Sequence, residues 1–183
     1  MTATLVLGGV RSGKSRYAEQ LLREEPKVTY LAPGYPADPS DPQWAQRVEN
    51  HQARRPDHWT TLETLDLAGA IREATTPLLI DCLGLWLTRF LDGIGGWESP
   101  REASIAVAWA VRDLADAWTH APTDIVAVTN EVGFGVVPST PAGGLFRDEL
   151  GRLNATLSAV SDRVYLVAAG RVLDLSNAPV VGD

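Results

Sequence analysis

Eight residues near the N-terminus carry the clearest chemical signal in this sequence. Residues 8–15 read Gly-Gly-Val-Arg-Ser-Gly-Lys-Ser and match the P-loop pattern G-x-x-x-x-G-K-[ST] at every specified position. In such a loop backbone N–H groups surround phosphate oxygens, Lys14 reaches the β- and γ-phosphates, and the Ser15 hydroxyl holds Mg²⁺. We therefore expect a nucleotide-binding site made by Gly8, Gly9, Val10, Arg11, Ser12, Gly13, Lys14 and Ser15.

The sequence on either side of this loop supports the interpretation. The apolar run 4–7 precedes the loop, and apolar residues recur at helical spacing over residues 14–23. This gives the strand, loop and helix context that a P-loop requires, with the positive N-terminus of the helix facing the anion. The alternative is a glycine-rich turn that matches the pattern by chance, which the flanking elements make less favourable.

A carboxylate at the end of a second apolar run extends this chemistry. Residues 78–81 read Leu-Leu-Ile-Asp, which is typical of a Walker B strand, where the acid supports Mg²⁺ near the P-loop hydroxyl. Asp81 is thus a candidate metal-supporting residue together with Ser15. It is also in place to cap a helix over residues 84–91, and this alternative stays open here.

A polar stretch over residues 43–55 contains a histidine among arginines and is closed by a proline. If the stretch is helical, Arg47, His51 and Arg55 have i, i+4, i+8 spacing and share one face. A site for anion chemistry and a solvated polar helix both fit this pattern. Spacing alone favours the solvated helix, because charge-rich helix faces usually face water.

Composition limits the classes of function. A chain of 183 residues is most simply one domain, 1–183, and its formal charge of −7 argues against a broad nucleic-acid surface. No apolar run approaches the roughly 20 residues of a transmembrane helix, and the N-terminus lacks the basic region of a secretory signal. Cys82 is the only cysteine, which excludes an internal disulfide and predicts a buried core residue. We expect a cytoplasmic protein.

The elements that must position these residues alternate along the chain. Strands are expected at 4–7, 28–32, 78–81, 125–129 and 164–168, with an edge strand within 58–64 and a final hairpin strand at 172–175. Helices are expected at 14–23 and 65–73, after residue 100, and from Leu145 onward. This order predicts an α/β fold with a mostly parallel sheet flanked by helices, in the manner of P-loop NTPases.

The helix after residue 100 is expected to bury much of its surface. Val107, Val111, Leu114 and Trp118 follow helical spacing, and Ile105, Ala108 and Trp109 widen the apolar stripe. Tryptophans so spaced are more often core or subunit-interface residues than base-stacking groups.

Two loops leave the expected strands at the edge where open α/β sheets bind ligands. Residues 33–42 are rich in proline and form either a surface excursion or part of the nucleotide site, with neither favoured. Residues 130–138 place a polar Asn-Glu pair and two glycines after the strand at 125–129, which indicates a shaped loop at the same edge.

Four stretches taken together resemble one family: residues 8–16, 47–56, 81–83 and 128–138. Their order and spacing are similar to those of the bifunctional adenosylcobinamide kinase and adenosylcobinamide-phosphate guanylyltransferase of cobalamin biosynthesis. The resemblance implies that His51, in the stretch R-[IV]-x-x-H-x-x-x-R-P, is the catalytic nucleophile that attacks the α-phosphate of GTP. It therefore reverses the preference for a solvated polar helix.

The same resemblance extends the list of nucleotide contacts and implies the overall reaction. Besides the P-loop and Asp81, the nucleotide is expected to contact Pro33, Gly34, Tyr35, Gln52, Ala53, Arg54, Arg55 and Glu63. The implied enzyme phosphorylates adenosylcobinamide with ATP or GTP, using Mg²⁺, and then transfers GMP to adenosylcobinamide phosphate. It is also implied to be a homotrimer. The rival hypotheses are a single-function P-loop kinase and a nucleotide-binding regulatory module without turnover.

Overall fold

A seven-stranded sheet organises the computed structural model, which describes residues 1–181. Its strand order is β3-β2-β4-β5-β1-β6-β7, and every neighbouring pair is parallel except β6 and β7, which are antiparallel. The predicted mostly parallel sheet and the C-terminal hairpin strand are both confirmed. The strands are β1 (Ala3–Gly8), β2 (Thr29–Leu31), β3 (Thr60–Leu62), β4 (Leu78–Asp81), β5 (Ile125–Asn130), β6 (Arg163–Ala168) and β7 (Arg171–Asp174).

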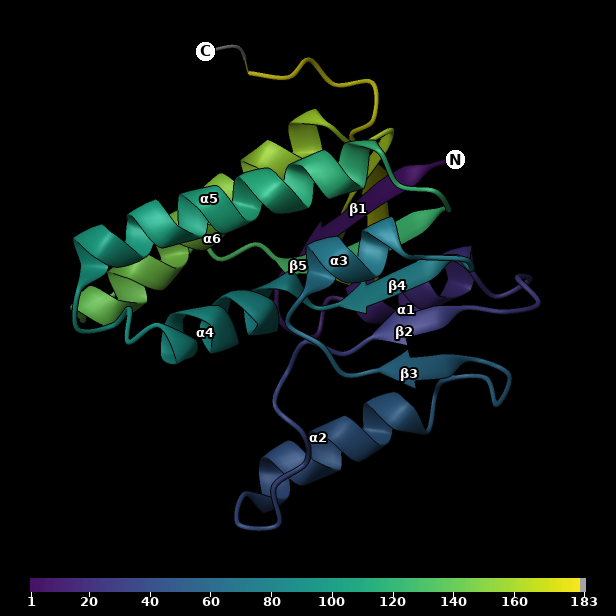
Figure 1. Ribbon diagram of the computed structural model, residues 1–183, viewed down its shortest axis with the longest axis horizontal. Coiled ribbons are helices and arrows are strands. Elements are labelled where there is room, and N and C mark those ends of the chain that lie inside the picture. Colours follow the sequence, from purple (N-terminus) through teal and green to yellow (C-terminus); the bar gives the residue numbers. More distant parts are fainter. Residues whose placement is uncertain (182–183) are drawn as a thin grey trace.

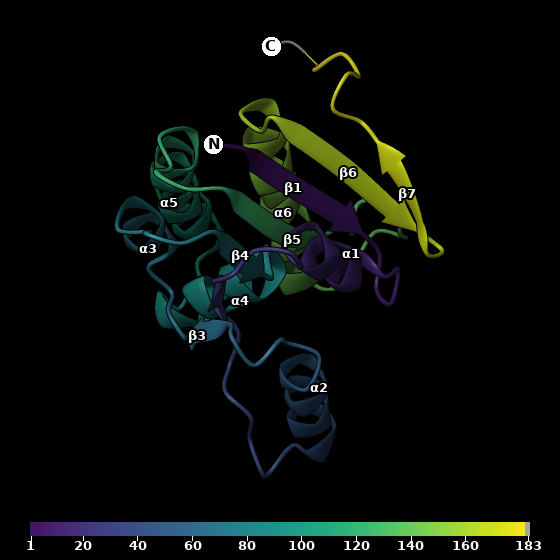
Figure 2. The same ribbon diagram turned by 90° about the vertical axis from the view of Figure 1, so that its right-hand side faces the viewer.

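The helices cover the two faces of this sheet unequally. On one face α3, α4, α5 and α6 pack together with the sheet, whereas α1 supplies the helical residues of the other core cluster (Figure 1). Helix α2 stands apart from both layers, as Figure 2 shows from a second side. The helices are α1 (Lys14–Leu21), α2 (Pro42–Gln52), α3 (Leu67–Arg72), α4 (Leu83–Gly93), α5 (Pro100–Thr119) and α6 (Pro141–Ala159).

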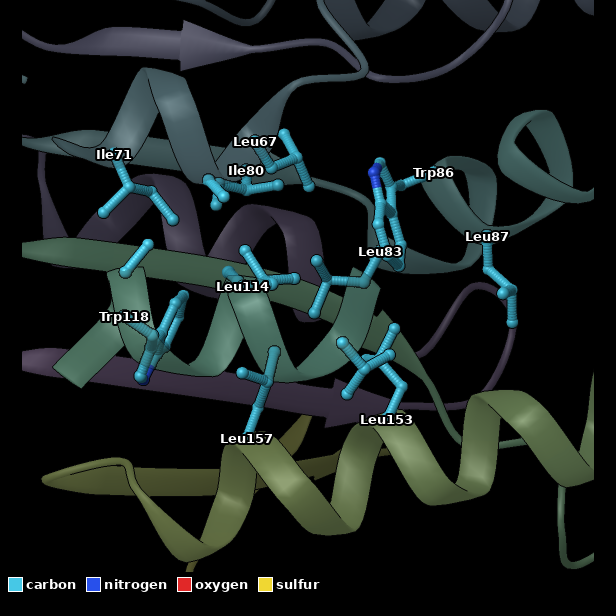
Figure 3. Packing of buried hydrophobic residues seen from close by; sticks show 14 of the residues in the cluster. Leu67, Ile71, Ile80, Leu83, Trp86, Leu87, Leu114, Trp118, Leu153 and Leu157 are labelled. Carbon is cyan, nitrogen blue, oxygen red and sulfur yellow. The ribbon is translucent and has the colours of Figure 1, made fainter. Parts of the chain in front are cut away.

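Strand side chains alternate between these two layers. In β1, Leu5 packs with the cluster of α3 to α6, while Val6 packs with α1 on the opposite face. Such strands read as continuous hydrophobic runs because both of their faces are buried. Figure 3 shows the larger layer, where Leu114 and Trp118 of α5 and Leu153 of α6 converge near the sheet.

Helix α5 differs from the expectation in how much it buries. The stripe through Val107, Val111, Leu114 and Trp118 is buried, but Ile105 is 56% exposed and Trp109 is 66% exposed. The prediction that these residues widen the buried stripe is therefore wrong in the single chain. The physical reason is that the sheet side needs only the narrower stripe, and these two side chains lie on the outer side of the helix.

Helix α6 begins four residues earlier than its apolar spacing predicts. The side-chain oxygen of Thr140 accepts a hydrogen bond from the Gly143 N–H at 3.1 Å, and Pro141 occupies the first helical position. A threonine cap followed by proline is a helix start that local chemistry sets without apolar residues.

In the part of the chain that is described, no helix is both long and apolar enough to cross a membrane.

Candidate active site

The P-loop lies between β1 and α1 and is held by its own backbone. Gly13 has a φ of 101°, a conformation that favours glycine, and α1 begins directly after it at Lys14. A side chain at Gly8 is excluded, because a Cβ there would lie 2.5 Å from the carbonyl oxygen of Val167 in β6. The glycines therefore let the loop pack closely against the sheet.

The lysine of the loop is buried and points back onto it. Lys14 is 8% exposed, and its Nζ donates to the carbonyl oxygen of Gly9 at 3.0 Å. Burial lowers the pKa of Lys14 from its ordinary value, while the nearby Cys82 and Asp81 act in the opposite direction. This arrangement keeps the ammonium group inside the loop, in a place where an anion is a favourable partner.

A cavity of about 1430 Å³ opens at the carboxyl ends of the strands, between the sheet and α2. Ligand pockets are usually roughly 300–1,000 Å³, so this cavity has room for more than one small ligand. Most of the predicted site residues line it: Val10, Arg11, Ser12, Gly13, Lys14, Ser15, Gly34, Tyr35, His51, Gln52, Arg54, Arg55, Glu63 and Asp81.

Four of the predicted contacts do not line this cavity: Gly8, Gly9, Pro33 and Ala53. Gly8 and Gly9 instead support the loop, through the close approach to β6 and the hydrogen bond from Lys14. The carbonyl oxygen of Pro33 accepts a hydrogen bond from Arg89 of α4 at 3.1 Å. Gly8, Gly9 and Pro33 thus support the cavity walls without facing the space inside.

His51 faces the end of β4 across the cavity. Its Nδ1 lies 3.4 Å from Asp81 Oδ2 and also 3.4 Å from Arg54 Nη2. These two contacts require opposite roles of the nitrogen, because Nδ1 donates to a carboxylate only when it carries the proton. The guanidinium of Arg54 is already paired with Glu19 of α1 at 3.1 Å. We therefore assign the proton to Nδ1 and the hydrogen bond to Asp81, which leaves Nε2 with a free lone pair.

Asp81 is nearly enclosed and is held from several elements. Its side chain is 7% exposed, and its Oδ2 accepts from the Tyr30 hydroxyl at 3.1 Å. Burial raises the pKa of Asp81, but hydrogen bonds from His51, Ser15 and Tyr30 outweigh this effect and leave it below its ordinary value. The carboxylate is consequently ionised at neutral pH.

The capping alternative for Asp81 is wrong. Helix α4 begins at Leu83, its N-cap residue is Cys82, and no side chain makes a capping hydrogen bond there. The carboxylate points into the cavity instead, toward Tyr30 and His51.

Asp81 and Ser15 meet the requirements for supporting Mg²⁺. Both side chains line the cavity beside Lys14, and Ser15 is close enough to lower the pKa of Asp81. Within residues 1–181 no group of three or more His, Cys, Asp or Glu side chains forms a dedicated metal cage. One or two protein oxygens completed by phosphates and water are the usual magnesium environment of nucleotide enzymes.

The shared helical face predicted for Arg47, His51 and Arg55 is only partly present. Helix α2 carries the first two residues but ends at Gln52. Arg55 precedes Pro56, which disfavours helical geometry for the residue before it. Arg55 nevertheless reaches the same cavity from the chain that follows the helix.

The proline-rich loop at 33–42 contributes to the cavity wall. Gly34, Tyr35 and Pro36 line the cavity. The Trp44 indole N–H of α2 donates to the carbonyl oxygens of Tyr35 and Pro36, at 3.2 and 3.0 Å. The loop thus connects α2 to the end of β2.

The sequence analysis did not predict several of the cavity residues as individual contacts, among them Tyr30, Thr61 and Asn130. Tyr30 belongs to a short buried strand, where an aromatic residue is typical of core packing. Asn130 ends β5, and only its place after a buried strand pointed to this edge. No spacing or motif marks Thr61 on the edge strand β3.

Comparison with known proteins is consistent with this geometry. The family described as "Cobinamide kinase / cobinamide phosphate guanyltransferase" matches residues 4–175. A bifunctional adenosylcobalamin biosynthesis protein CobU from Salmonella typhimurium is 37% identical over 180 residues, covering 91% of this chain and 95% of that relative. The bifunctional protein CobP from Pseudomonas aeruginosa is 39% identical over 183 residues, covering 96% and 98%.

Among solved structures, a protein from Pyrococcus horikoshii OT3 has a similar fold, with a TM-score of 0.53 at 8% identity. The similarity covers 99% of this chain and 90% of that one. It concerns the fold alone. The match over residues 4–175 and the two bifunctional relatives show that this chain belongs to the cobinamide kinase and cobinamide phosphate guanyltransferase family.

Proposed function

We propose that this protein phosphorylates adenosylcobinamide and then transfers GMP from GTP to adenosylcobinamide phosphate, giving adenosylcobinamide-GDP. The observation that carries the proposal is the position of His51, whose imidazole shares one cavity with a complete P-loop and is oriented by Asp81 at 3.4 Å. Family membership supplies the substrates, and the cavity supplies the groups that the two reactions need.

In the kinase reaction the P-loop binds ATP or GTP through its backbone amides. Lys14 offsets negative charge on the β- and γ-phosphates, and Ser15 and Asp81 would hold Mg²⁺, which would supply further charge neutralisation. The side-chain hydroxyl of adenosylcobinamide attacks the γ-phosphorus and gives its proton to solvent. The bond from this phosphorus to the bridging oxygen breaks, and the nucleoside diphosphate leaves. Positioning and electrostatic stabilisation supply most of the catalysis in this class of reaction.

In the transferase reaction His51 acts as the nucleophile. Its free Nε2 attacks the α-phosphorus of GTP, an N–P bond forms, and the bond to pyrophosphate breaks. A phosphate oxygen of adenosylcobinamide phosphate then attacks the same phosphorus and displaces His51. Asp81 holds the imidazole in the reactive tautomer, as carboxylates do for catalytic histidines.

Arginines surround the place where charge develops. Arg47, Arg54 and Arg55 line the cavity beside His51, and Arg11 lines it from the P-loop. Guanidinium groups bind phosphate oxygens through paired hydrogen bonds, so they favour the triphosphate and the leaving pyrophosphate. The proposed nucleotide contacts also include Gln52 and Glu63, which line the cavity, and Ala53, which lies next to Gln52 but outside the lining.

One cavity has to serve two different phosphorus atoms. Its volume of about 1430 Å³ accommodates a nucleotide together with the phosphorylated end of the acceptor. None of residues 42–52 in α2 is buried, so His51 is carried by a helix that can shift relative to the P-loop. We propose that such a shift selects between γ- and α-phosphate attack.

The proposal includes a cytoplasmic homotrimer in which residues 1–183 form one catalytic domain. Trp109 and Ile105 on α5 are 66% and 56% exposed and give neighbouring subunits an apolar surface to cover.

Labelling tests the transferase half. The protein is incubated with Mg²⁺ and GTP labelled at the α-phosphate, then precipitated and counted. We expect an acid-labile, base-stable adduct that is absent from His51→Ala and normal in His120→Ala, whose exposed imidazole lies outside the cavity. A wild-type protein that forms no adduct contradicts this half and leaves the single-function kinase as the better hypothesis.

Phosphorylation of adenosylcobinamide tests the kinase half. Lys14→Ala should lose ATP-dependent phosphorylation, whereas Lys27→Ala, at the other lysine of the chain, should retain it. Full activity of Lys14→Ala contradicts the role of the P-loop. Nucleotide binding without either reaction in wild type favours the regulatory module.

A further inference from the structure

Tyr30 touches two parts of the cavity at once and has no role in the mechanism described so far. It lies on β2 in the body of the sheet and is 1% exposed. Its hydroxyl donates to Asp81 Oδ2 at 3.1 Å, and the Arg55 guanidinium lies 3.5 Å above the centre of its ring. One rigid side chain therefore supports both the carboxylate and a cavity arginine.

The Tyr30 hydroxyl and His51 contact the same oxygen of the Asp81 carboxylate. Asp81 Oδ2 is the atom that accepts from Tyr30 and also the atom that faces His51 Nδ1 at 3.4 Å. A carboxylate held on one oxygen by a fixed donor has little freedom to rotate, so the second donor meets it at a defined angle. Because α2 has no buried residue among 42–52, this contact is the fixed reference for the imidazole.

The ring has a second task on the opposite side. Arg55 donates from Nη1 to Thr61 Oγ1 at 2.9 Å, but its buried Nε has no hydrogen-bond partner among the described residues. A guanidinium that stacks on an aromatic face keeps its in-plane donors free for an anion. Tyr30 thus presents Arg55 to the cavity without consuming those donors.

If Tyr30 were only a core residue, it would need fewer specific contacts. A buried tyrosine requires a single acceptor for its hydroxyl, and any backbone carbonyl would satisfy it. Here the acceptor is an ionised side chain of the site, and the ring lies beneath a cation that lines the same cavity. Burial, followed by the nearby Asp81, raises the pKa of Tyr30, so the hydroxyl stays a donor at neutral pH.

We propose that Tyr30 is a positioning residue for guanylyl transfer, acting through Asp81 on His51 by its hydroxyl and through Arg55 on the nucleotide by its ring. This inference rests on the proposed function, because it presupposes that His51 accepts GMP. Loss of the hydroxyl and loss of the ring of Tyr30 should therefore have different effects on the reaction.

Tyr30→Phe removes the hydroxyl and keeps the ring. Loss of a hydrogen bond to a charged group predicts roughly 10- to 100-fold slower adduct formation at saturating GTP, with half-saturation changed by less than about twofold. Tyr30→Leu removes both parts and should also raise the half-saturating GTP concentration. Tyr165→Phe, at a partly buried tyrosine of β6 outside the cavity, is the matched control.

A double-mutant cycle separates positioning from packing. If Tyr30 acts through Asp81, then Tyr30→Phe causes little further slowing when Asp81→Asn is already present. The same slowing factor in both backgrounds overturns the role. So does a Tyr30→Phe protein whose rate equals that of wild type, or one that loses its cooperative thermal unfolding transition, since the residue would then be only a core side chain.

The result also distinguishes this inference from the proposed function. A wild-type protein without adduct overturns both. Normal adduct formation in wild type and in Tyr30→Phe alike overturns only the role of Tyr30 and leaves His51 as the nucleophile.

Discussion

The two halves of the cavity are built in opposite ways. The P-loop lies between β1 and α1, with Ser12 and Lys14 buried and Gly8 packed against β6. Residues 42–55, here called the histidine segment, carry His51 on a helix that buries none of residues 42–52. Figure 1 shows this difference directly, since α2 stands clear of the layered body.

This contrast separates two requirements of the chemistry. A phosphate cradle must be rigid, because its backbone donors are useful only in a fixed geometry. The proposed nucleophile, His51, would act in only one of the two reactions and would therefore have to approach and withdraw. Its segment is tied to the body by polar contacts, such as Arg54 to Glu19 and His51 to Asp81, instead of by a hydrophobic core.

The largest expected effect comes from damaging the rigid half. Gly8→Ala puts a Cβ 2.5 Å from the Val167 carbonyl oxygen, so the loop or β6 has to move. We expect about 1–3 kcal/mol of destabilisation and loss of both activities. Thermal unfolding measures the first and the two product assays the second. Gly9→Ala, whose Cβ would have no atom within 4 Å, should leave the unfolding temperature nearly unchanged.

Hydrogen exchange should separate the two halves without any mutation. Amides of β5 and β1 lie in the centre of the sheet and should exchange only through unfolding of the whole domain, which costs about 5–15 kcal/mol. Amides of α2 should open locally at a small fraction of that free energy. Mass spectrometry of peptides from the two regions checks this, and equal protection would show that the histidine segment is part of the rigid body.

The reactivity of the Cys82 thiol measures how readily the cavity lining between the two halves opens. Burial, followed by the nearby Asp81, raises the pKa of its thiol from 9.0 to about 11. The neutral thiol therefore contributes stability below pH 9 that is lost as the pH rises toward 11. At pH 8 we expect slow alkylation in the folded protein and fast alkylation after denaturation. Fast alkylation of the native protein would mean that the cavity floor opens readily.

The smallest effect is expected from the tie between the halves. Glu19→Gln removes the partner of Arg54, and a partly exposed ion pair contributes about 0–1 kcal/mol. Adduct formation should slow by up to about fivefold, and high salt should reduce this difference. Phosphorylation of adenosylcobinamide should stay at the wild-type rate. An equal loss in both assays would show that Glu19 serves the P-loop instead.

The sequence predicted the rigid half better than the histidine segment. Apolar runs and helical spacing are the physical cause of sheet packing, so they identified β1, β4 and β5 and the helices on them. The P-loop was recognisable because its glycines obey a strict steric requirement. The proposed role of His51, in contrast, came from resemblance to a family, because a polar helix without buried residues has no apolar pattern that reveals its packing.

Long-range contacts explain what was missed. Tyr30 and Asp81 are 51 residues apart, and no local pattern reveals that one hydrogen-bonds to the other. The same holds for the exposure of Trp109, because its helical spacing fits an apolar stripe whose width depends on what packs against it. Spacing gives the direction of a side chain on its own element, whereas its partners depend on the topology of the sheet.

The unburied surface of α2 also makes the histidine segment accessible to measurement. Glu49 lies on this helix outside the cavity lining, and its replacement removes no buried side chain. A cysteine introduced there can carry a fluorophore, while the native Cys82 stays shielded by its burial. Paired with a second dye on the exposed end of α5, such a label would test in single molecules whether the histidine segment shifts during turnover, as proposed.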